Sequence, residues 1–295
     1  MTKEVSAFIE SFDRLGYVVD EEMATILFLM TSLQKPLLLE GHPGVGKTEV
    51  ANILAAHLGT ELIRLQCYEG LDVHSAVYEW NYQKQLLSIK IQESNQKTDT
   101  EKEKHIFGKD FLMPRPLLKA ISGSTKSPVL LIDEIDRADE EFEAFLLELL
   151  SAYQISIPEF GTIKAIHPPF VILTSNRTRE LSDALRRRCL YHWVNYPDFD
   201  KELKIVHKHL PDIDQKLSEQ LVRAINVLRN KNLEKSPGIS ETLDWALSLH
   251  ALGKKKLDEE SFAITQGSVL KSYSDNEKIN TEGVAKILQE ASEFK

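Results

Sequence analysis

Residues 41–48 constrain the fold of this chain more than any other segment. They read Gly-His-Pro-Gly-Val-Gly-Lys-Thr and fit the pattern G-x-x-x-x-G-K-[ST]. Glycines let successive backbone N–H groups point inward around the phosphates of a nucleotide, a conformation that side chains would obstruct. In this pattern the lysine supplies a mobile cation and the threonine hydroxyl is a magnesium ligand. The candidate nucleotide-binding residues are therefore Gly41, His42, Pro43, Gly44, Val45, Gly46, Lys47, Thr48 and Glu49.

The flanking sequence argues against the alternative, a glycine-rich turn without a ligand. A short apolar strand is predicted at Leu37–Leu39, directly before the motif, and an amphipathic helix at Glu49–Leu58, directly after it. A helix that begins behind the glycines adds the positive end of its dipole to the phosphate site. The sequence therefore predicts a phosphate cradle between a buried strand and a helix.

Two carboxylates, Asp133 and Glu134, follow a second apolar strand at Val129–Ile132. Strand ends of this kind face the ligand in a doubly wound sheet. We expect Asp133 to hold magnesium and Glu134 to orient and deprotonate an attacking water, because phosphoryl transfer needs positioning and a base. The alternative is that the acidic pair caps a helix that begins at Ala138.

A third apolar strand, Phe170–Thr174, ends in Ser175 and Asn176. An amide at the tip of a central strand can sit between the acidic pair and the terminal phosphate and hold the water. The alternative is that Asn176 only begins a loop.

An arginine triplet, Arg186-Arg187-Arg188, lies a short distance after Asn176. Such a triplet is usually a solvated basic surface. In a ring of copies, an arginine here would reach the phosphate bound by the neighbour and stabilise charge in the transition state. Arg188 is the first candidate and Arg187 the second. Arg137 is a further candidate, for which a structural salt bridge is the alternative.

Strands without strict alternation, separated by helical patterns, predict a parallel sheet covered on both faces. The fourth such strand is Glu61–Gln66. We predict an α/β nucleotide-binding domain at 1–196, a doubly wound parallel sheet, followed by an all-helical lid domain at 197–295. A hairpin is expected at 154–165 and an exposed mobile loop at 93–104.

Composition narrows the class of protein. The formal net charge is −9, and a protein that wraps nucleic acid needs a basic footprint, so nucleic acid is not an expected partner. The longest apolar stretch, 23–30, is too short to span a bilayer. The first residues mix acidic with apolar side chains, unlike a signal peptide. Cys67 and Cys189 have no metal-ligand spacing, so we expect reduced thiols in the cytoplasm.

The order of these motifs resembles the AAA+ ATPases. The sequences GHPGVGKT, LLIDEIDRA, FVILTSN and DALRRRC follow one another as in that family. Asp-Glu-x-x-Arg-Ala at 133–138, the stretch 64–66 before an inserted segment, and the hairpin resemble the MoxR group. The segment 236–245, SPGISETLDW, is similar to the branch linked to maturation of carbon monoxide dehydrogenase and related molybdenum enzymes. The resemblance covers roughly residues 15–255.

This resemblance implies a homo-hexameric ring, ATP with Mg²⁺, and a partner that carries a von Willebrand factor A domain. It also implies that the inserted segments near 68–92 and 154–165 face the ring pore or the substrate. The adenine would contact Tyr17, Val18 and Val19. Many relatives have arginine in the Ser-Pro-Arg of the lid, where this chain has Gly238.

Three functions are compatible with the sequence. The leading hypothesis is a Mg-ATP-dependent ATPase that remodels or assembles a partner complex during metallocofactor insertion, with a molybdenum enzyme as the client. The second is a nucleotide-gated scaffold that recruits a von Willebrand factor A domain partner with little mechanical work. The third, a nucleic-acid translocase, predicts stimulation by DNA or RNA, which the acidic balance opposes.

Overall fold

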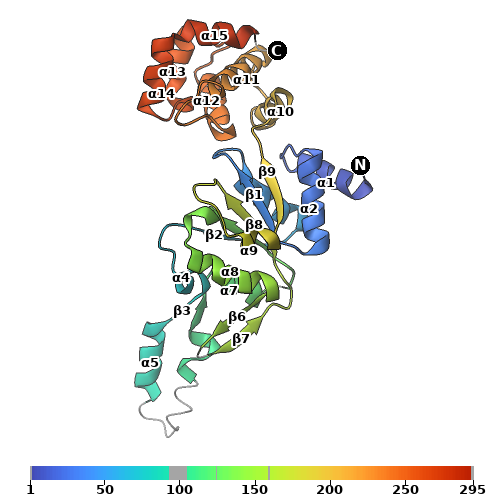
Figure 1. Ribbon diagram of the computed structural model, residues 1–295, viewed down its shortest axis with the longest axis vertical. Helices are drawn as coiled ribbons and strands as arrows, with labels where there is room; N and C mark the ends of the chain where they lie inside the picture. The colour runs from blue at the N-terminus through green and yellow to red at the C-terminus, as the bar shows by residue number, and fades with distance from the viewer. Residues whose placement is uncertain (1, 93–104, 124, 159, 294–295) are drawn as a thin grey trace. The chain divides into compact units, whose positions relative to one another are not determined.

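The computed structural model describes residues 2–92, 105–123, 125–158 and 160–293 (Figure 1). The loop expected at 93–104 lies outside these residues. The chain divides into two compact units. One comprises 1–21, 41–47 and 193–295, and the other comprises 22–40 and 48–192. The predicted domain boundary at 196/197 remains a prediction.

A five-stranded sheet organises the nucleotide-binding part, with strand order β2–β5–β8–β1–β9. The β2–β5, β5–β8 and β8–β1 pairs are parallel. Every residue of β1 and β5 is buried, so both faces of these strands are covered, as the unbroken apolar runs predict. The strands are β1 Leu37–Gly41, β2 Leu62–Gln66, β5 Val129–Asp133, β8 Phe170–Ser175 and β9 Leu190–Val194.

The register brings the carboxyl ends of these strands together. Gln66 of β2 lies beside Asp133 of β5, and Glu40 of β1 lies beside Ser175 of β8. Asp133, Ser175 and the residues that follow each strand therefore share one edge of the sheet. This edge is where a doubly wound sheet binds its ligand.

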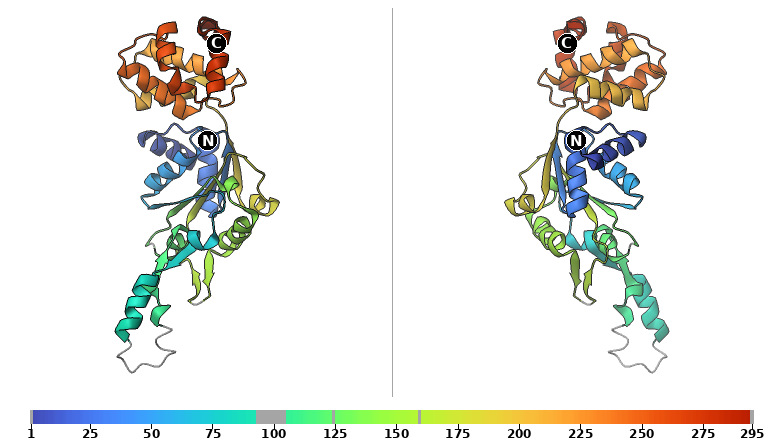
Figure 2. Two further views of the ribbon diagram at one scale, coloured as in Figure 1. Left: turned by 90° about the vertical axis from the view of Figure 1, so that its left-hand side faces the viewer. Right: turned by 90° about the vertical axis from the view of Figure 1, so that its right-hand side faces the viewer.

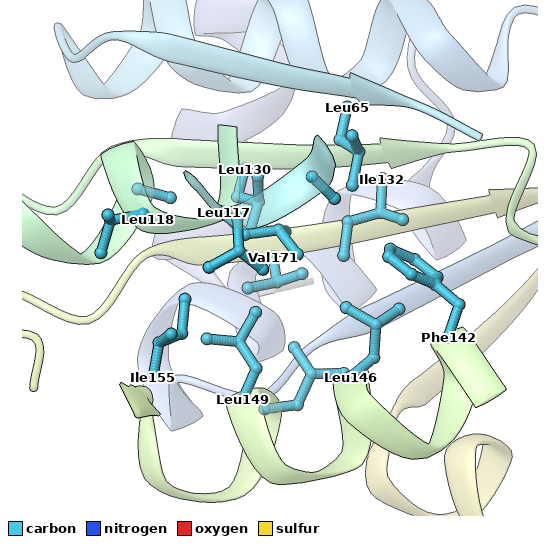
Figure 3. Packing of buried hydrophobic residues seen from close by; sticks show 14 of the residues in the cluster. Leu65, Leu117, Leu118, Leu130, Ile132, Phe142, Leu146, Leu149, Ile155 and Val171 are labelled. Atoms are coloured by element: carbon cyan, nitrogen blue, oxygen red, sulfur yellow. The ribbon is translucent and has the colours of Figure 1, made fainter. Parts of the chain in front are cut away.

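Helices α7 and α8 pack on the sheet through their apolar faces (Figure 3). Leu117 and Leu118 of α7 lie against Leu130 and Val171, and Phe142 of α8 lies against Ile132. Each buried side chain of this size contributes about 1.5–3 kcal/mol to folding. The helices of this part are α2 Glu21–Leu33, α3 Lys47–Leu58, α7 Pro116–Ser122, α8 Glu140–Ala152 and α9 Asp183–Arg188.

The start of α8 excludes one interpretation of the acidic pair. The N-cap of α8 is Asp139, whose carboxylate accepts a hydrogen bond from Phe142 N at 2.8 Å. Between the acidic pair and this cap, the chain forms a 3₁₀ turn, η2 (Ile135–Arg137). The interpretation of Asp133 and Glu134 as a helix cap is therefore wrong, because a different carboxylate performs that task.

Two small antiparallel sheets extend from the main one. The hairpin of β6 (Gln154–Ile157) and β7 (Gly161–Lys164) confirms the predicted hairpin. Strands β3 and β4 pair across an insertion and were not predicted. The inserted elements, of which α5 projects away from the sheet (Figure 2), are α4 Val73–Val77, β3 Tyr78–Trp80, α5 Tyr82–Gln92, η1 Lys109–Phe111 and β4 Leu112–Pro114.

The C-terminal region is all-helical in its described residues, as predicted. Its core surrounds Trp245 and Phe262, whose rings meet edge to face at 5.3 Å. No helix within the described ranges is both long enough and apolar enough to cross a bilayer. With the N-terminal α1 Lys3–Arg14, the helices of this unit are α10 Phe199–His209, α11 Gln215–Arg229, α12 Ile239–Ala251, α13 Glu259–Val269, α14 Tyr273–Glu282 and α15 Val284–Glu293.

A buried ion pair joins three of these helices. Arg229 at the end of α11 binds Glu202 of α10 through two hydrogen bonds of 2.7 Å, and Thr242 of α12 donates to the same carboxylate at 2.7 Å. Glu202 is fully buried. Removing its charge would leave the guanidinium without compensation in a dry site.

We expect Glu202→Gln to lower the free energy of unfolding of the helical region by about 3 kcal/mol. The matched control is Glu260→Gln, whose exposed pair with Lys254 is 3.4 Å long and should contribute about 0.5 kcal/mol or less. Urea denaturation, monitored by hydrogen exchange of the amides in α10, α11 and α12, measures the change in the free energy of unfolding for both variants. Equal effects of the two substitutions would contradict the assignment.

Candidate active site

The glycine-rich loop has the backbone that its sequence predicts. Gly44 and Gly46 have φ values of +75° and +91°, a region that side chains disfavour. Lys47, the first residue of α3, is buried, and its ammonium donates to the carbonyls of Gly41 and His42 at 2.7 Å each. The loop thus combines left-handed glycines with a buried cation at its end, which fits a polyphosphate.

The start of α12 contacts this loop directly. Ile239 N donates to Gly44 O at 2.8 Å. A Cβ at Gly238 would lie 2.7 Å from Gly44 Cα. Glu241 accepts a hydrogen bond from Gly238 N at 2.9 Å and holds this turn. Glycine at position 238 therefore allows the backbone of α12 to touch the phosphate loop.

A stack of side chains reaches the same loop. The His42 ring is parallel to the Tyr196 ring, with centroids 5.0 Å apart, and Trp193 meets His42 edge to face. The Arg229 guanidinium lies 4.5 Å from the centroid of Tyr196. Its Nε also donates to Pro237 O at 2.8 Å, next to Gly238. His42 thus contacts Tyr196, which precedes α10, and Gly44 contacts the turn at the start of α12.

Asp133 collects donors from three elements. Its carboxylate accepts from Thr48 Oγ1 at 3.1 and 3.3 Å, from Thr174 Oγ1 at 2.5 Å and from Arg64 Nη2 at 2.6 Å. Thr48 and Asp133 are the residues predicted to hold magnesium. A hydroxyl and a carboxylate in contact are the hard oxygen ligands that Mg²⁺ prefers, so the pair fits this ion.

Glu134 lies beside it in a strained conformation. Its φ and ψ are 54° and 50°, and its N–H donates to Thr174 Oγ1 at 2.9 Å. Such left-handed non-glycine residues cost about 1–3 kcal/mol and cluster at functional sites. The carboxylate of Glu134 is about one-third exposed and is approached by Gln66 Nε2 at 3.1 Å, Asn176 Nδ2 at 3.4 Å and Arg137 Nε at 2.8 Å.

Asn176 therefore reaches the acidic pair even though it follows the end of β8. Its backbone N–H donates to Asp136 Oδ2 at 3.2 Å, and Asp136 also accepts from Thr178 N and Oγ1. Asp136 is buried and fixes this turn. The arrangement supports a role of Asn176 at the site over the alternative that it only begins a loop.

Sequence reasoning missed Arg64 and Gln66 as site residues. Arg64 Nη2 donates to both Asp133 and Gln66 Oε1, the latter at 2.8 Å, so the two side chains connect the acidic residues. The signal was present, because 64 and 66 are polar positions on one side of an otherwise apolar strand. Only the β2–β5 register shows that this side meets Asp133.

The candidate arginines occupy different environments. Arg137 forms an ion pair with Glu134, the structural alternative considered for it. Arg187 is exposed and pairs with Asp183 one turn earlier in α9, at 2.7 Å. The Arg188 side chain is exposed and has no hydrogen-bond or ion-pair partner in the part of the chain described. Arg186 turns inward to Glu40.

The residues predicted to contact adenine lie before α2. Val18 and Val19 are half-buried. Val18 lines a cavity of about 380 Å³ in the unit that contains the helical region. The other lining residues are Asp13, Leu203, Lys204, His207 and Lys208. Apolar stems with a few polar ends fit a planar base, and the assignment to adenine remains a prediction.

Both cysteines are free thiols. Burial raises the pKa of Cys67 to about 12, and the nearby Asp133, Asp136 and Glu134 add to the rise. Burial also raises the pKa of Cys189 to about 12. These raised pKa values keep both thiols protonated at neutral pH, which argues against either cysteine as a nucleophile.

Comparison with known proteins identifies the family. The AAA domain (dynein-related subfamily) matches residues 36–189, just over half of the chain. This chain belongs to that AAA family. An uncharacterized protein of Staphylococcus aureus is 30% identical over 226 residues, 75% of this chain and 76% of its own. One of Staphylococcus haemolyticus is 27% identical over 239 residues, 79% and 81% of the two chains.

Solved structures of similar fold include the Holliday junction branch migration motor RuvB of Thermotoga maritima. It is 17% identical, with a TM-score of 0.45, over 90% of this chain and 67% of that one. A variant of the same RuvB with an arginine replaced by alanine has a TM-score of 0.48 at 17% identity, over 90% and 72% of the two chains.

A side chain at position 238 should disturb the AAA domain's phosphate loop. We expect Gly238→Ala to lower the free energy of unfolding by about 1–3 kcal/mol, because the added Cβ meets Gly44. The Ile239 amide should also exchange its hydrogen faster.

The control is Gly267→Ala, at an exposed position of α13 where an added Cβ meets no atom within 4 Å. It should raise stability by up to about 1 kcal/mol. Chemical denaturation of both variants decides between a contact and an open position at 238.

Proposed function

We propose that this protein is a Mg-ATP-dependent AAA+ ATPase of the MoxR type, which remodels or assembles a partner protein complex. The observation that carries the proposal is the acidic cluster. Asp133 accepts a hydrogen bond from Thr48, and Glu134 accepts hydrogen bonds from Gln66 and Asn176. Thr48 immediately follows Lys47 of the phosphate loop. The start of α3 and the end of β5 thus bring Thr48 into contact with the acidic pair.

The roles follow from the contacts. The glycine-rich loop, 41–48, binds the phosphates with Lys47, and Glu49 follows at the helix start. Thr48 and Asp133 hold Mg²⁺, which neutralises charge on the phosphates when bound. Glu134 takes the proton of the attacking water, and Asn176 orients that water. Tyr17, Val18 and Val19 bind the adenine.

The site is completed in a homo-hexameric ring. Arg188, with Arg187 as the second candidate, stabilises the phosphate charge in the neighbour's site. The nucleotide-binding domain comprises 1–196 and the lid domain 197–295. The exposed side chain of Arg188 supports the proposal, because it can leave its own chain without breaking an ion pair in the described residues.

The protein acts in the cytoplasm. Its partner carries a von Willebrand factor A domain, and the client is a molybdenum enzyme that receives its metallocofactor. The inserted segments support a contact role. Helix α5 exposes Tyr82, Leu86, Leu87 and Ile91 by 60% or more each, and apolar patches of this kind mark interaction sites.

A nucleotide-gated scaffold is the second candidate. It is favoured by Gly238, because a lid without an arginine at this position has one fewer group to couple its motion to hydrolysis. In that case the ATP-bound ring recruits the partner and turnover only times its release.

Replacement of the base tests the enzymatic role. Glu134→Gln should lower kcat for ATP hydrolysis by about 10²-fold or more while nucleotide binding is retained. Glu141→Gln, on the exposed first turn of α8, is the matched control and should hydrolyse ATP normally. Absence of hydrolysis by the wild type at ring-forming concentration, with no effect of Glu134→Gln, contradicts the proposal.

The same variant separates remodelling from scaffolding. A complex captured with ATP and Glu134→Gln is assayed for client activity. If remodelling is the function, the client stays inactive, because ATP binding without hydrolysis cannot complete the remodelling of the client. If the client is activated to the wild-type level, the scaffold is correct.

A further inference from the structure

Glu40 is a buried carboxylate at the end of β1, directly before the first glycine of the phosphate loop. Its side chain is 3% exposed. Tyr191 Oη donates to Oε2 at 3.0 Å, and Arg186 Nη2 lies 3.6 Å from the same oxygen. Arg177 Nε is 4.0 Å away. None of the roles assigned above uses this carboxylate.

The partners of Glu40 belong to two functional segments. Arg177 directly follows Asn176 and has a left-handed backbone with φ of 57°. Arg186 belongs to α9, the helix that ends in Arg187 and Arg188. A carboxylate this deeply buried is stable in its charged form only with nearby positive charges, which these two guanidiniums supply. Glu40 therefore links the phosphate loop to both segments.

The contact with Glu40 distinguishes Arg186 from the other two arginines of α9. The Arg186 guanidinium also lies over the Tyr191 ring, 5.9 Å from its centroid. Removing it from Glu40 would leave a buried charge poorly compensated. Within the described residues, Arg187 pairs with Asp183 of its own helix, and the Arg188 side chain is exposed. One arginine of the triplet is therefore an anchor, and the last one is available to another molecule.

Two further contacts fix the orientation of α9. Leu185 is fully buried, and the Ser182 N–H before the helix donates to the buried Glu143 at 2.9 Å. Because Leu185 is buried and Arg186 contacts Glu40, the orientation of the helix face that carries Arg188 is fixed. A six-residue helix has few other restraints.

We propose that Glu40 is a positioning residue for α9: it holds Arg186, so that Arg188 is presented to the neighbouring protomer. Glu40 directly precedes Gly41 in the chain, so the residue that positions α9 adjoins the phosphate loop in sequence. The inference rests on the proposed function, in which an α9 arginine acts in trans.

The first arm of the experiment measures ATP hydrolysis. Arg188→Ala should lower kcat on the order of 10³-fold. Glu40→Gln and Arg186→Gln should each lower kcat about five- to tenfold with the KM for ATP unchanged, and their combination should be no worse than either alone. Glu180→Gln, at an exposed position in the loop before α9, is the matched control and should be close to wild type. Arg186→Lys, which keeps a charge for Glu40, should recover most of the loss.

Epistasis with Arg188 distinguishes positioning from general damage. In the Arg188→Ala background, Glu40→Gln and Arg186→Gln should change kcat no further. A further loss there, or a loss for Arg186→Gln equal to that for Arg188→Ala without recovery by lysine, overturns the inference and makes Arg186 itself the acting group.

The second arm does not depend on hydrolysis. Hydrogen exchange of the amides at 183–188 should be faster in Glu40→Gln and Arg186→Gln than in wild type, with unchanged exchange in β5 and α8 as evidence of an intact fold. Unchanged exchange in α9 overturns the inference whatever the ATPase result. An inactive wild type, or a fully active Arg188→Ala, contradicts the proposed function instead.

Discussion

The carboxylate of Asp133 is the constraint on which the site depends. It is buried at the tip of a central strand, where an uncompensated charge would cost several kcal/mol. Thr48, Thr174 and Arg64 meet that cost with hydrogen bonds from the start of α3, from β8 and from β2. One carboxylate therefore contacts three elements at the carboxyl edge of the sheet. A divalent cation at Thr48 and Asp133, as proposed, would offset the same cost.

Backbone strain lies on both sides of this charge. Glu134 and Arg177, which begin the loops after β5 and β8, both have left-handed conformations. Thr174 binds the Glu134 N–H, the Ser175 hydroxyl accepts from Arg177 N at 3.0 Å, and Asp136 binds the N–H of Asn176 between them. Each such residue costs about 1–3 kcal/mol and persists because these bonds over-determine it. The result is that Glu134 and Asn176 converge, which extended strand ends would not allow.

The sequence predicted what depends on local pattern and missed what depends on pairing. The phosphate loop, the apolar strands β1, β5 and β8, and the β6–β7 hairpin all have local signals. Strand β9 was not predicted, because Tyr191 is exposed and its neighbours are only half-buried. Its strand character depends on pairing next to β1. Strands β3 and β4 are three residues each and pair across an insertion, so no short window contains both.

The arginines show the same division between local pattern and tertiary partner. In sequence, Arg64, Arg186 and Arg229 are ordinary basic residues, yet each is bound to a buried carboxylate: Asp133, Glu40 and Glu202. Of these three pairs, only Arg229–Glu202 is buried on both sides, and breaking such a pair from one side costs about 3–5 kcal/mol. The Arg64 and Arg186 side chains are 52% and 40% exposed, so solvent screens their pairs, but their withdrawal would still take a partner from a buried carboxylate. Arg187 has an exposed partner, whose loss costs about 1 kcal/mol at most. An arginine that must cross to a neighbouring subunit has to be one that its own chain does not hold, and within α9 that condition selects Arg188.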